Sequence, residues 1–252
     1  CMIKIKEKSV KLCHCEENAE HSTSQSHYNG ITTSLVTLAP RNDRKIGFTL
    51  AEVLITLGII GVVTAMTIPT LIKNYQQTRT INQLKKAYSV LNQALKMSEI
   101  DNDSVENWSK VQDIGETEYT NKYWKPYLKI VKTCNSPKDC GYENNTPWQN
   151  ANKTNRAISP NQGFIITSDG VLLGFRSYLN ANGTIFVDLN GSQNPNKLGN
   201  DLFVFVIRKE GVKPAGQSMT YCNKNNTGTD NGVYCSGVIM LNGWKIPDDY
   251  PW

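Results

Sequence analysis

One apolar stretch, residues 46–72, constrains this chain more than any other part of it. It reads IGFTLAEVLITLGIIGVVTAMTIPTLI, and its last twenty residues, Val53–Ile72, carry no charge. A helix of about 20 apolar residues is long enough to cross the hydrocarbon core of a membrane. We therefore expect a membrane-spanning helix here, because a core helix of a soluble domain is rarely apolar on every side over this length.

The charges around this stretch predict its orientation. Arg41, Arg44 and Lys45 precede it, and no comparable cluster follows directly after Ile72. Basic residues beside a membrane helix stay preferentially in the cytoplasm. The sequence thus predicts a single-pass protein with a cytoplasmic N-terminus and an exported C-terminal part.

The exported part has the composition of a protein without catalytic machinery. After Phe48 the chain holds twenty basic and seventeen acidic residues, scattered evenly, so nucleic acid is not an expected partner. All three histidines lie before Phe48, which removes histidine-dependent catalysis and histidine-ligated zinc from the exported part. A carboxylate-based hydrolase using Asp169, Asp188 and Asp201 is the remaining enzymatic alternative. Turn and loop roles explain all three residues, so we expect no enzyme.

Four of the seven cysteines follow the apolar stretch, at positions 134, 140, 222 and 235. An even number of exported cysteines in two local pairs is typical of disulfides. Four cysteines allow three connectivities, and we favour Cys134–Cys140 with Cys222–Cys235 because both loops close locally. Four unpaired buried thiols are the alternative.

The segment GFTLAEVLI, residues 47–55, resembles the processing signal of type IV pilins and of the pseudopilins of type II secretion. This resemblance implies that a prepilin peptidase cuts between Gly47 and Phe48 and that the new N-terminal Phe48 is methylated. It also assigns Glu52 to the glutamate at the fifth mature position and Pro69 to the proline that kinks the helix. The resemblance is specific over residues 45–75 and weak beyond them.

Elementary chemistry supports these assignments. A carboxylate such as that of Glu52 costs about 2.5–3.5 kcal/mol at mid-bilayer, so it needs a partner. The α-amine of Phe48 is a cation that exists only after cleavage, and in the family the glutamate meets this amine on a neighbouring subunit. Pro69 removes a helical N–H, so the helix should bend or melt locally there. Gly61 and Ala65 form a small-xxx-small pair suited to close helix packing.

Three regions follow from this pattern: a cytoplasmic prepilin leader over residues 1–47, a long helix over 48–100 and an exported head over 101–252. A translation start near 35–38 would shorten the unusually long leader. The helix spans the membrane in its first half. In its second half an apolar stripe recurs every three or four residues, which predicts packing on the head: Ile81, Leu84, Tyr88, Leu91 and Leu95.

The head is predicted to contain about four antiparallel strands, at residues 164–167, 171–175, 184–188 and 202–207. An Asp-Gly turn joins the first two. We expect an α+β fold in which the long helix packs on this sheet, as in pilins. Residues 101–162 are expected to form an irregular connector pinned by aromatic side chains, and Cys222–Trp252 resembles the disulfide-bounded surface loop of many pilins.

One loop offers a candidate metal site. The side-chain oxygens of Asp188, Asn190, Ser192 and Asp201 are calcium-type ligands, and some pseudopilins bind calcium in a comparable loop. The loop lacks the spacing of an EF-hand. An Asx-rich turn without metal is the alternative, and we expect no cofactor.

Together these observations predict a structural subunit, either a prepilin of a type IV pilus-like filament or a pseudopilin of type II secretion. Its expected partners are the prepilin peptidase, sister subunits, and the assembly platform of the bacterial inner membrane with its ATPase. The subunit then leaves the membrane for a periplasmic or extracellular filament. The alternative is a minor pilin at the filament tip, which binds a surface, DNA or a secreted protein.

Overall fold

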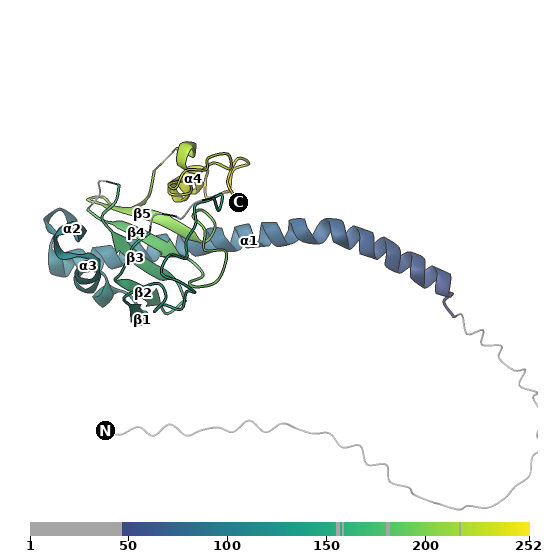
Figure 1. Cartoon of the computed structure of the whole chain (residues 1–252), viewed down its shortest axis with the longest axis horizontal. Helices are drawn as coiled ribbons and strands as arrows, with labels where there is room; N and C mark the ends of the chain where they lie inside the picture. The colour runs from purple at the N-terminus through teal and green to yellow at the C-terminus, as the bar shows by residue number, and fades with distance from the viewer. Residues whose placement is uncertain (1–46, 155–156, 158, 180–181, 217) are drawn as a thin grey trace, which may run out of the picture. The chain divides into compact units, whose positions relative to one another are not determined.

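The computed structural model describes residues 47–154, 157, 159–179, 182–216 and 218–252. The chain divides into two units, residues 1–50 and 51–252. Only residues 47–50 of the first unit are described, so the predicted leader, its basic cluster and its start lie outside the described residues. The second unit holds a long helix, α1, and a head built on a β-sheet (Figure 1).

Helix α1 runs from Leu50 to Asn102, within two residues of the predicted bounds. Its second half carries the predicted apolar stripe, in which Leu84, Leu91 and Leu95 are buried and Tyr88 is half-buried. The helix ends before Asp103, whose φ of 66° places it in the left-handed region that aspartate tolerates better than most residues. The amphipathic half of α1 is therefore part of the head, as the periodicity indicates.

The sheet has six antiparallel strands in sequential order, β1-β2-β3-β4-β5-β6, where four were predicted. Their bounds are β1 Ile130–Cys134, β2 Phe164–Thr167, β3 Leu172–Arg176, β4 Thr184–Asp188, β5 Leu202–Arg208 and β6 Gly211–Pro214. The prediction missed β1 and β6, which are the two edge strands. Both carry a lysine, and β6 ends in proline, which are common features of sheet edges. Such features weaken the strand signal in the sequence.

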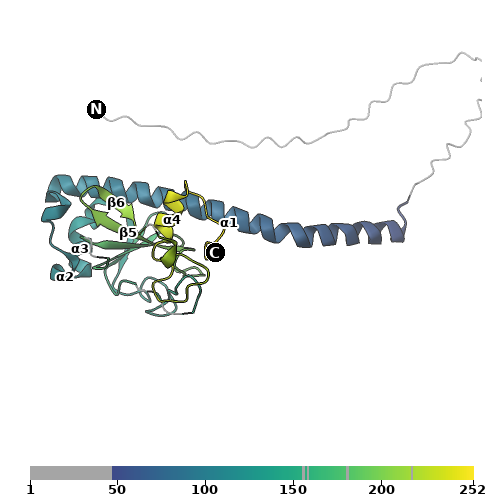
Figure 2. The same ribbon diagram turned by 90° about the horizontal axis from the view of Figure 1, so that it is seen from above.

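Both faces of the sheet are covered. Alternate side chains of the central strands, such as Phe203 and Phe205, pack with α1 in one apolar cluster. The others, such as Val204 and Phe186, pack with Trp148 and the loops on the opposite face. In two perpendicular views α1 lies alongside the sheet (Figures 1 and 2). This two-sided burial explains why β4 and β5 are continuous apolar runs rather than alternating ones.

Short elements fill the segments predicted as irregular. Before β1 lie η1 Val105–Asn107, α2 Val111–Ile114, α3 Glu116–Tyr123 and η2 Lys125–Tyr127, and after β6 lie η3 Met219–Tyr221 and α4 Cys235–Leu241. The rings of Trp108 and Tyr123 stack with centroids 4.3 Å apart, so aromatic residues do pin the connector to the core. Helix α4 was not predicted, because seven residues are too few to show a helical period.

Candidate functional site

The predicted cleavage site lies just before α1. Gly47, Phe48 and Thr49 are exposed and precede the first helical residue, Leu50, and Phe48 is 89% exposed. A Cβ added at Gly47 would meet no described atom within 4 Å, so packing among the described residues does not require glycine there. The Gly47–Phe48 peptide bond thus lies in an exposed segment outside the helix.

Glu52 is the acidic residue in the first turn of α1, and it is exposed. A carboxylate in the first turn is stabilised by the helix dipole, by about 0.3–1 kcal/mol at an exposed position. Glu52 thus lies at the end of α1 where the helix dipole favours negative charge.

Pro69 lies inside α1, yet the helix is unbroken from Leu50 to Asn102. The predicted local melting therefore does not occur, although the half of α1 beyond the head curves (Figure 1). Nearby, the Thr67 hydroxyl donates to the Val63 carbonyl at 3.0 Å, so a threonine hydroxyl bonds to the backbone one turn before the proline.

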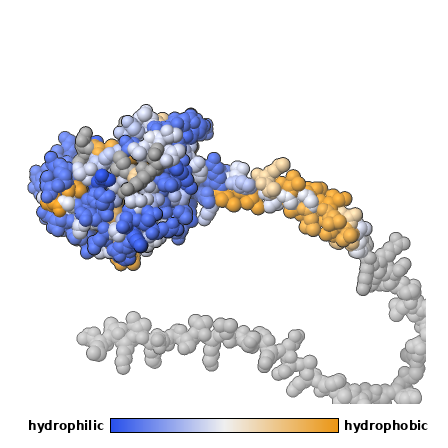
Figure 3. All heavy atoms as spheres, in the orientation of Figure 1, coloured by the Kyte–Doolittle hydropathy of each residue, from blue (hydrophilic) through white to orange (hydrophobic). Residues whose placement is uncertain are grey.

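The first half of α1 presents a continuous apolar surface to its surroundings. The large apolar side chains from Leu50 to Ile72 are 41–78% exposed, and they colour this half of the helix orange in Figure 3. Gly58 and Gly61 also face open space within the described structure. Among the described residues, α1 is the one helix that is long and apolar enough to cross a membrane, which fits single-pass anchoring.

Polar contacts fix the second half of α1 to the head. The Asn92 side chain accepts from the Val212 N–H at 3.0 Å and donates to the Val212 carbonyl at 3.2 Å, so its amide continues the edge of β6. Lys86 forms an ion pair with Asp169 at 2.8 Å. The sequence gives little sign of either contact, since asparagine and lysine on a helix are usually solvated.

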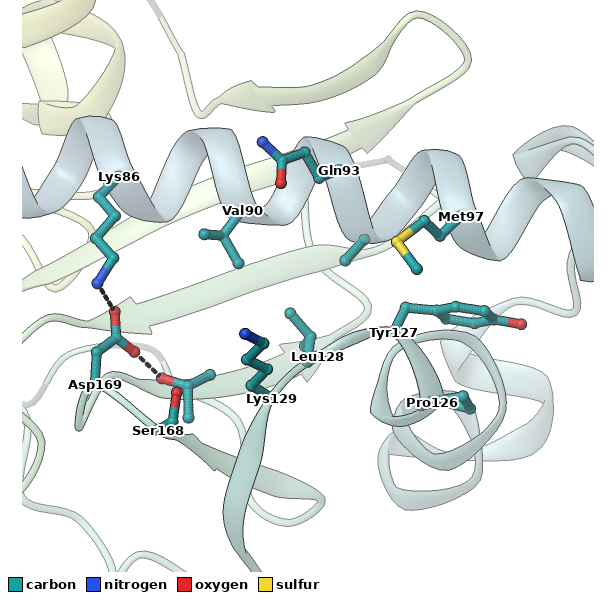
Figure 4. A pocket seen from close by; sticks show the side chains of 12 residues that line it. Lys86, Val90, Gln93, Met97, Pro126, Tyr127, Leu128, Lys129, Ser168 and Asp169 are labelled. Atoms are coloured by element: carbon teal, nitrogen blue, oxygen red, sulfur yellow. Dashed lines mark hydrogen bonds and ion pairs between the residues drawn. The ribbon is translucent and has the colours of Figure 1, made fainter. Parts of the chain in front are cut away.

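The Lys86–Asp169 pair borders a groove of about 640 Å³ between α1 and the turn joining β2 to β3. Val90 and Met97 of α1 form one wall, and Tyr127 lies at the far end (Figure 4). Burial opposes ionisation of Asp169, but hydrogen bonds from Lys86 and from its neighbouring threonine lower its pKa. The ion pair of Asp169 with Lys86 thus links the turn between β2 and β3 to α1.

Asp188 lies at the end of β4 in the interior of the head. Its Oδ2 accepts from the Tyr142 hydroxyl at 2.9 Å and from Trp148 Nε1 at 2.7 Å. Complete burial and the charge of nearby Asp201 raise the pKa of Asp188 to about 8. Neither aromatic donor was identified from the sequence, because both are far from Asp188 along the chain.

Asp201 braces the loop that leads from β4 to β5. Its carboxylate accepts the backbone N–H groups of Asn196, Lys197 and Leu202 at 2.8, 2.6 and 3.1 Å. Asp201 is 4% exposed, and burial raises its pKa. Asp188 is fully buried, whereas Asp201 borders a pocket of about 430 Å³ beside α1. Protein donors already engage both carboxylates, and the absence of enzymatic activity stays our prediction.

The predicted calcium ligands are brought together only in part. Ser192 is exposed, and Asp188 and Asp201 already accept protein N–H and O–H groups. Among the described residues, the buried side-chain oxygens of Asn190 and Asn196 lack a hydrogen-bond partner. Calcium takes six to eight oxygen ligands. Because protein donors already engage Asp188 and Asp201, an Asx-rich turn without metal stays our prediction.

Both predicted disulfides form. Cys134 pairs with Cys140, closing a loop beside the β1 edge, and Cys222 pairs with Cys235 at the start of α4. The second disulfide is buried in the cluster that includes α1, so it ties the C-terminal segment to the core rather than lying on the surface.

Two families match the chain, and they divide it at Pro69, near the end of the apolar stretch. The prokaryotic N-terminal methylation motif covers residues 42–68, and a family of unknown function, DUF6613, covers residues 70–252. No curated protein and no solved structure matches the chain. The first match contains Gly47, Phe48 and Glu52, and the second contains the entire head. The chain is thus a member of the DUF6613 family whose long helix begins with the methylation motif of a type IV pilin-like prepilin.

Proposed function

We propose that the chain is a structural subunit of a type IV pilus-like or type II secretion filament. Prepilin peptidase cuts it between Gly47 and Phe48 and methylates Phe48. Before assembly the subunit is held in the inner membrane by α1, with its N-terminus in the cytoplasm. An assembly platform and its ATPase then move it into a filament of sister subunits.

The observation that carries this proposal is the division of α1 into two halves with opposite surroundings. Leu91 and Leu95 are at most 1% exposed in the head, whereas Leu54 and Leu57 are 61% and 60% exposed. So many exposed leucines are unfavourable in water, because burying one large apolar side chain lowers the free energy by about 1.5–3 kcal/mol. The first half of α1 therefore needs either lipid or other apolar helices around it. A filament of sister subunits supplies apolar helices.

Glu52 makes the transfer of the subunit from lipid into the filament favourable. In lipid its charge is costly, and a neighbouring subunit offers the α-amine of processed Phe48 as a partner. This pairing requires cleavage, because the amine does not exist in the unprocessed chain. Processing and assembly are thereby coupled through one residue pair.

A second candidate is a minor subunit at the filament tip that binds a surface, DNA or a secreted protein. It is favoured by the segment between Cys222 and Cys235, in which Lys224, Asn225 and residues 227–229 are exposed while the disulfide itself is buried. A rigid base with an exposed loop suits recognition. Shearing cells and probing the released fraction separates the two, because an abundant filament subunit is released in quantity.

Intact-mass analysis tests the processing step. The chain is coexpressed with a prepilin peptidase, and the expected product begins at Phe48 with one added methyl group. The matched variants are Gly47→Leu, which should leave the leader attached, and Gly58→Leu, which changes a glycine of α1 away from the cut. An intact leader on the unaltered chain, or a cut beyond Ile72, would refute the proposal.

A further inference from the structure

Three tyrosines and one aspartate surround a small hollow on the head, away from α1. Its lining consists of Tyr178, Leu179, Tyr221, Asp230, Val233 and Tyr234, and its volume is about 130 Å³. Ligand pockets for drug-sized molecules measure about 300–1,000 Å³, so this hollow has room for a single small group. None of these residues belongs to the processing motif, which covers residues 42–68.

Two of the tyrosines form a corner. The rings of Tyr221 and Tyr234 lie with centroids 5.0 Å apart and planes at 73°. Each tyrosine immediately precedes a cysteine of the Cys222–Cys235 disulfide, so the covalent bond holds the two rings in register. A flat sugar-binding platform would require coplanar exposed faces, whereas this corner encloses a compact group from two sides.

The backbone around Tyr234 fixes its ring further. Gly216 has a φ of 61°, and a Cβ there would lie only 2.0 Å from the Tyr234 ring. Glycine therefore lets the chain press directly against this ring. The peptide N–H groups of Gly232 and Tyr234 both bond to the Tyr221 carbonyl, at 2.7 and 3.4 Å. The corner is preorganised, which lowers the entropy cost of binding.

The third wall and the charge come from different parts of the chain. Tyr178 follows β3, and Asp230 belongs to the disulfide loop. Burial raises the pKa of Tyr178 to about 12, and the charge of the neighbouring Asp230 adds to the rise, so the ring is neutral at physiological pH. The described lining thus contains one acidic side chain and no basic one.

We propose that this hollow is an aromatic cage that binds an alkylated ammonium group, such as a trimethylammonium head. Aromatic faces attract cations through their quadrupole, and such cages are a known way to bind quaternary ammonium ions. Asp230 supplies the counter-charge, and Leu179 and Val233 supply apolar contact for methyl groups. A choline-type headgroup carries such a group, and it is the source that we propose. This proposal stands independently of filament assembly.

Isothermal titration of the full chain in a polyoxyethylene detergent tests the proposal, with tetramethylammonium, choline and phosphocholine as probes. Saturable binding of all three is expected. Two comparison compounds separate charge from shape: ammonium, which is charged but small, and the neutral analogue of choline in which a tert-butyl group replaces trimethylammonium. Both should bind more weakly. If phosphocholine binds more tightly than a trimethyl-lysine peptide, the ligand is a lipid-type headgroup. If the peptide binds more tightly than phosphocholine, the ligand is a methylated protein side chain instead.

Variants locate the binding site. Tyr221→Ala should weaken choline binding roughly 2- to 30-fold, the range expected for one cation–π contact. Tyr221→Phe keeps the ring and should retain affinity, and Tyr75→Ala removes an exposed tyrosine on α1 as a matched control. Asp230→Asn should weaken cations about fivefold and leave the neutral analogue unchanged. Failure of every cation to bind the folded chain, equal binding of the neutral analogue, or unchanged affinity in both Tyr221→Ala and Asp230→Asn would overturn the proposal.

Discussion

The contrast between the two halves of α1 yields a quantitative prediction for Leu95→Ala. Leu95 is fully buried in the cluster where α1 meets the sheet. Replacing a buried leucine by alanine costs about 2–5 kcal/mol, the sum of lost transfer free energy and the cavity left behind. With a urea dependence of about 2 kcal/mol per molar, the unfolding midpoint of the head should fall by about 1–2.5 M.

Tryptophan fluorescence in detergent is the assay, because Trp124 and Trp148 are both buried in the head and report on its unfolding. The matched control is Leu57→Ala, which makes the same chemical change on the same helix where the side chain is 60% exposed. Its effect on the head should stay within about 0.5 kcal/mol. Equal shifts for the two variants, or a shift under about 0.5 kcal/mol for Leu95→Ala, would refute the assignment of the two halves.

Three further outcomes are expected. Folding raises the pKa of Asp188 from 3.8 to about 8, so the folded state binds a proton more tightly than the unfolded chain, and the unfolding free energy should fall as pH rises between these values. Asp188→Asn should flatten this decline in urea titrations at several pH values. An unchanged slope in the variant would contradict the expectation. Replacing Cys222 and Cys235, which are 13 positions apart, with serine should lower stability by about 3 kcal/mol in the same assay. Unchanged stability of the double variant would contradict this expectation. Calcium added after chelation should produce no saturable heat in calorimetry, because protein donors already occupy Asp188 and Asp201; a heat that disappears in Asp201→Asn would show that a calcium site exists.

The periodicity of the chain was sufficient to predict α1, its apolar stripe and the central strands. Leu84, Leu91 and Leu95 recur at helical spacing, and spacing is a local property that the chain carries before it folds. The edge strands were missed for the opposite reason. Gly211–Pro214 becomes a strand because Asn92 and β5 offer hydrogen bonds to its backbone, and neither partner is near it in sequence.

The processing motif is likewise local, so residues 47–55 alone indicated a prepilin, and the two disulfides followed from cysteine spacing. Only the tertiary structure decided what the polar and aromatic side chains do. Asp188 became a buried acceptor because Tyr142 and Trp148 fold onto it from 40 or more residues away. Tyr178 meets Tyr221 and Tyr234 in one hollow because the sheet and the disulfide bring distant segments together. Such convergence depends on packing across the whole head, and no local pattern encodes it.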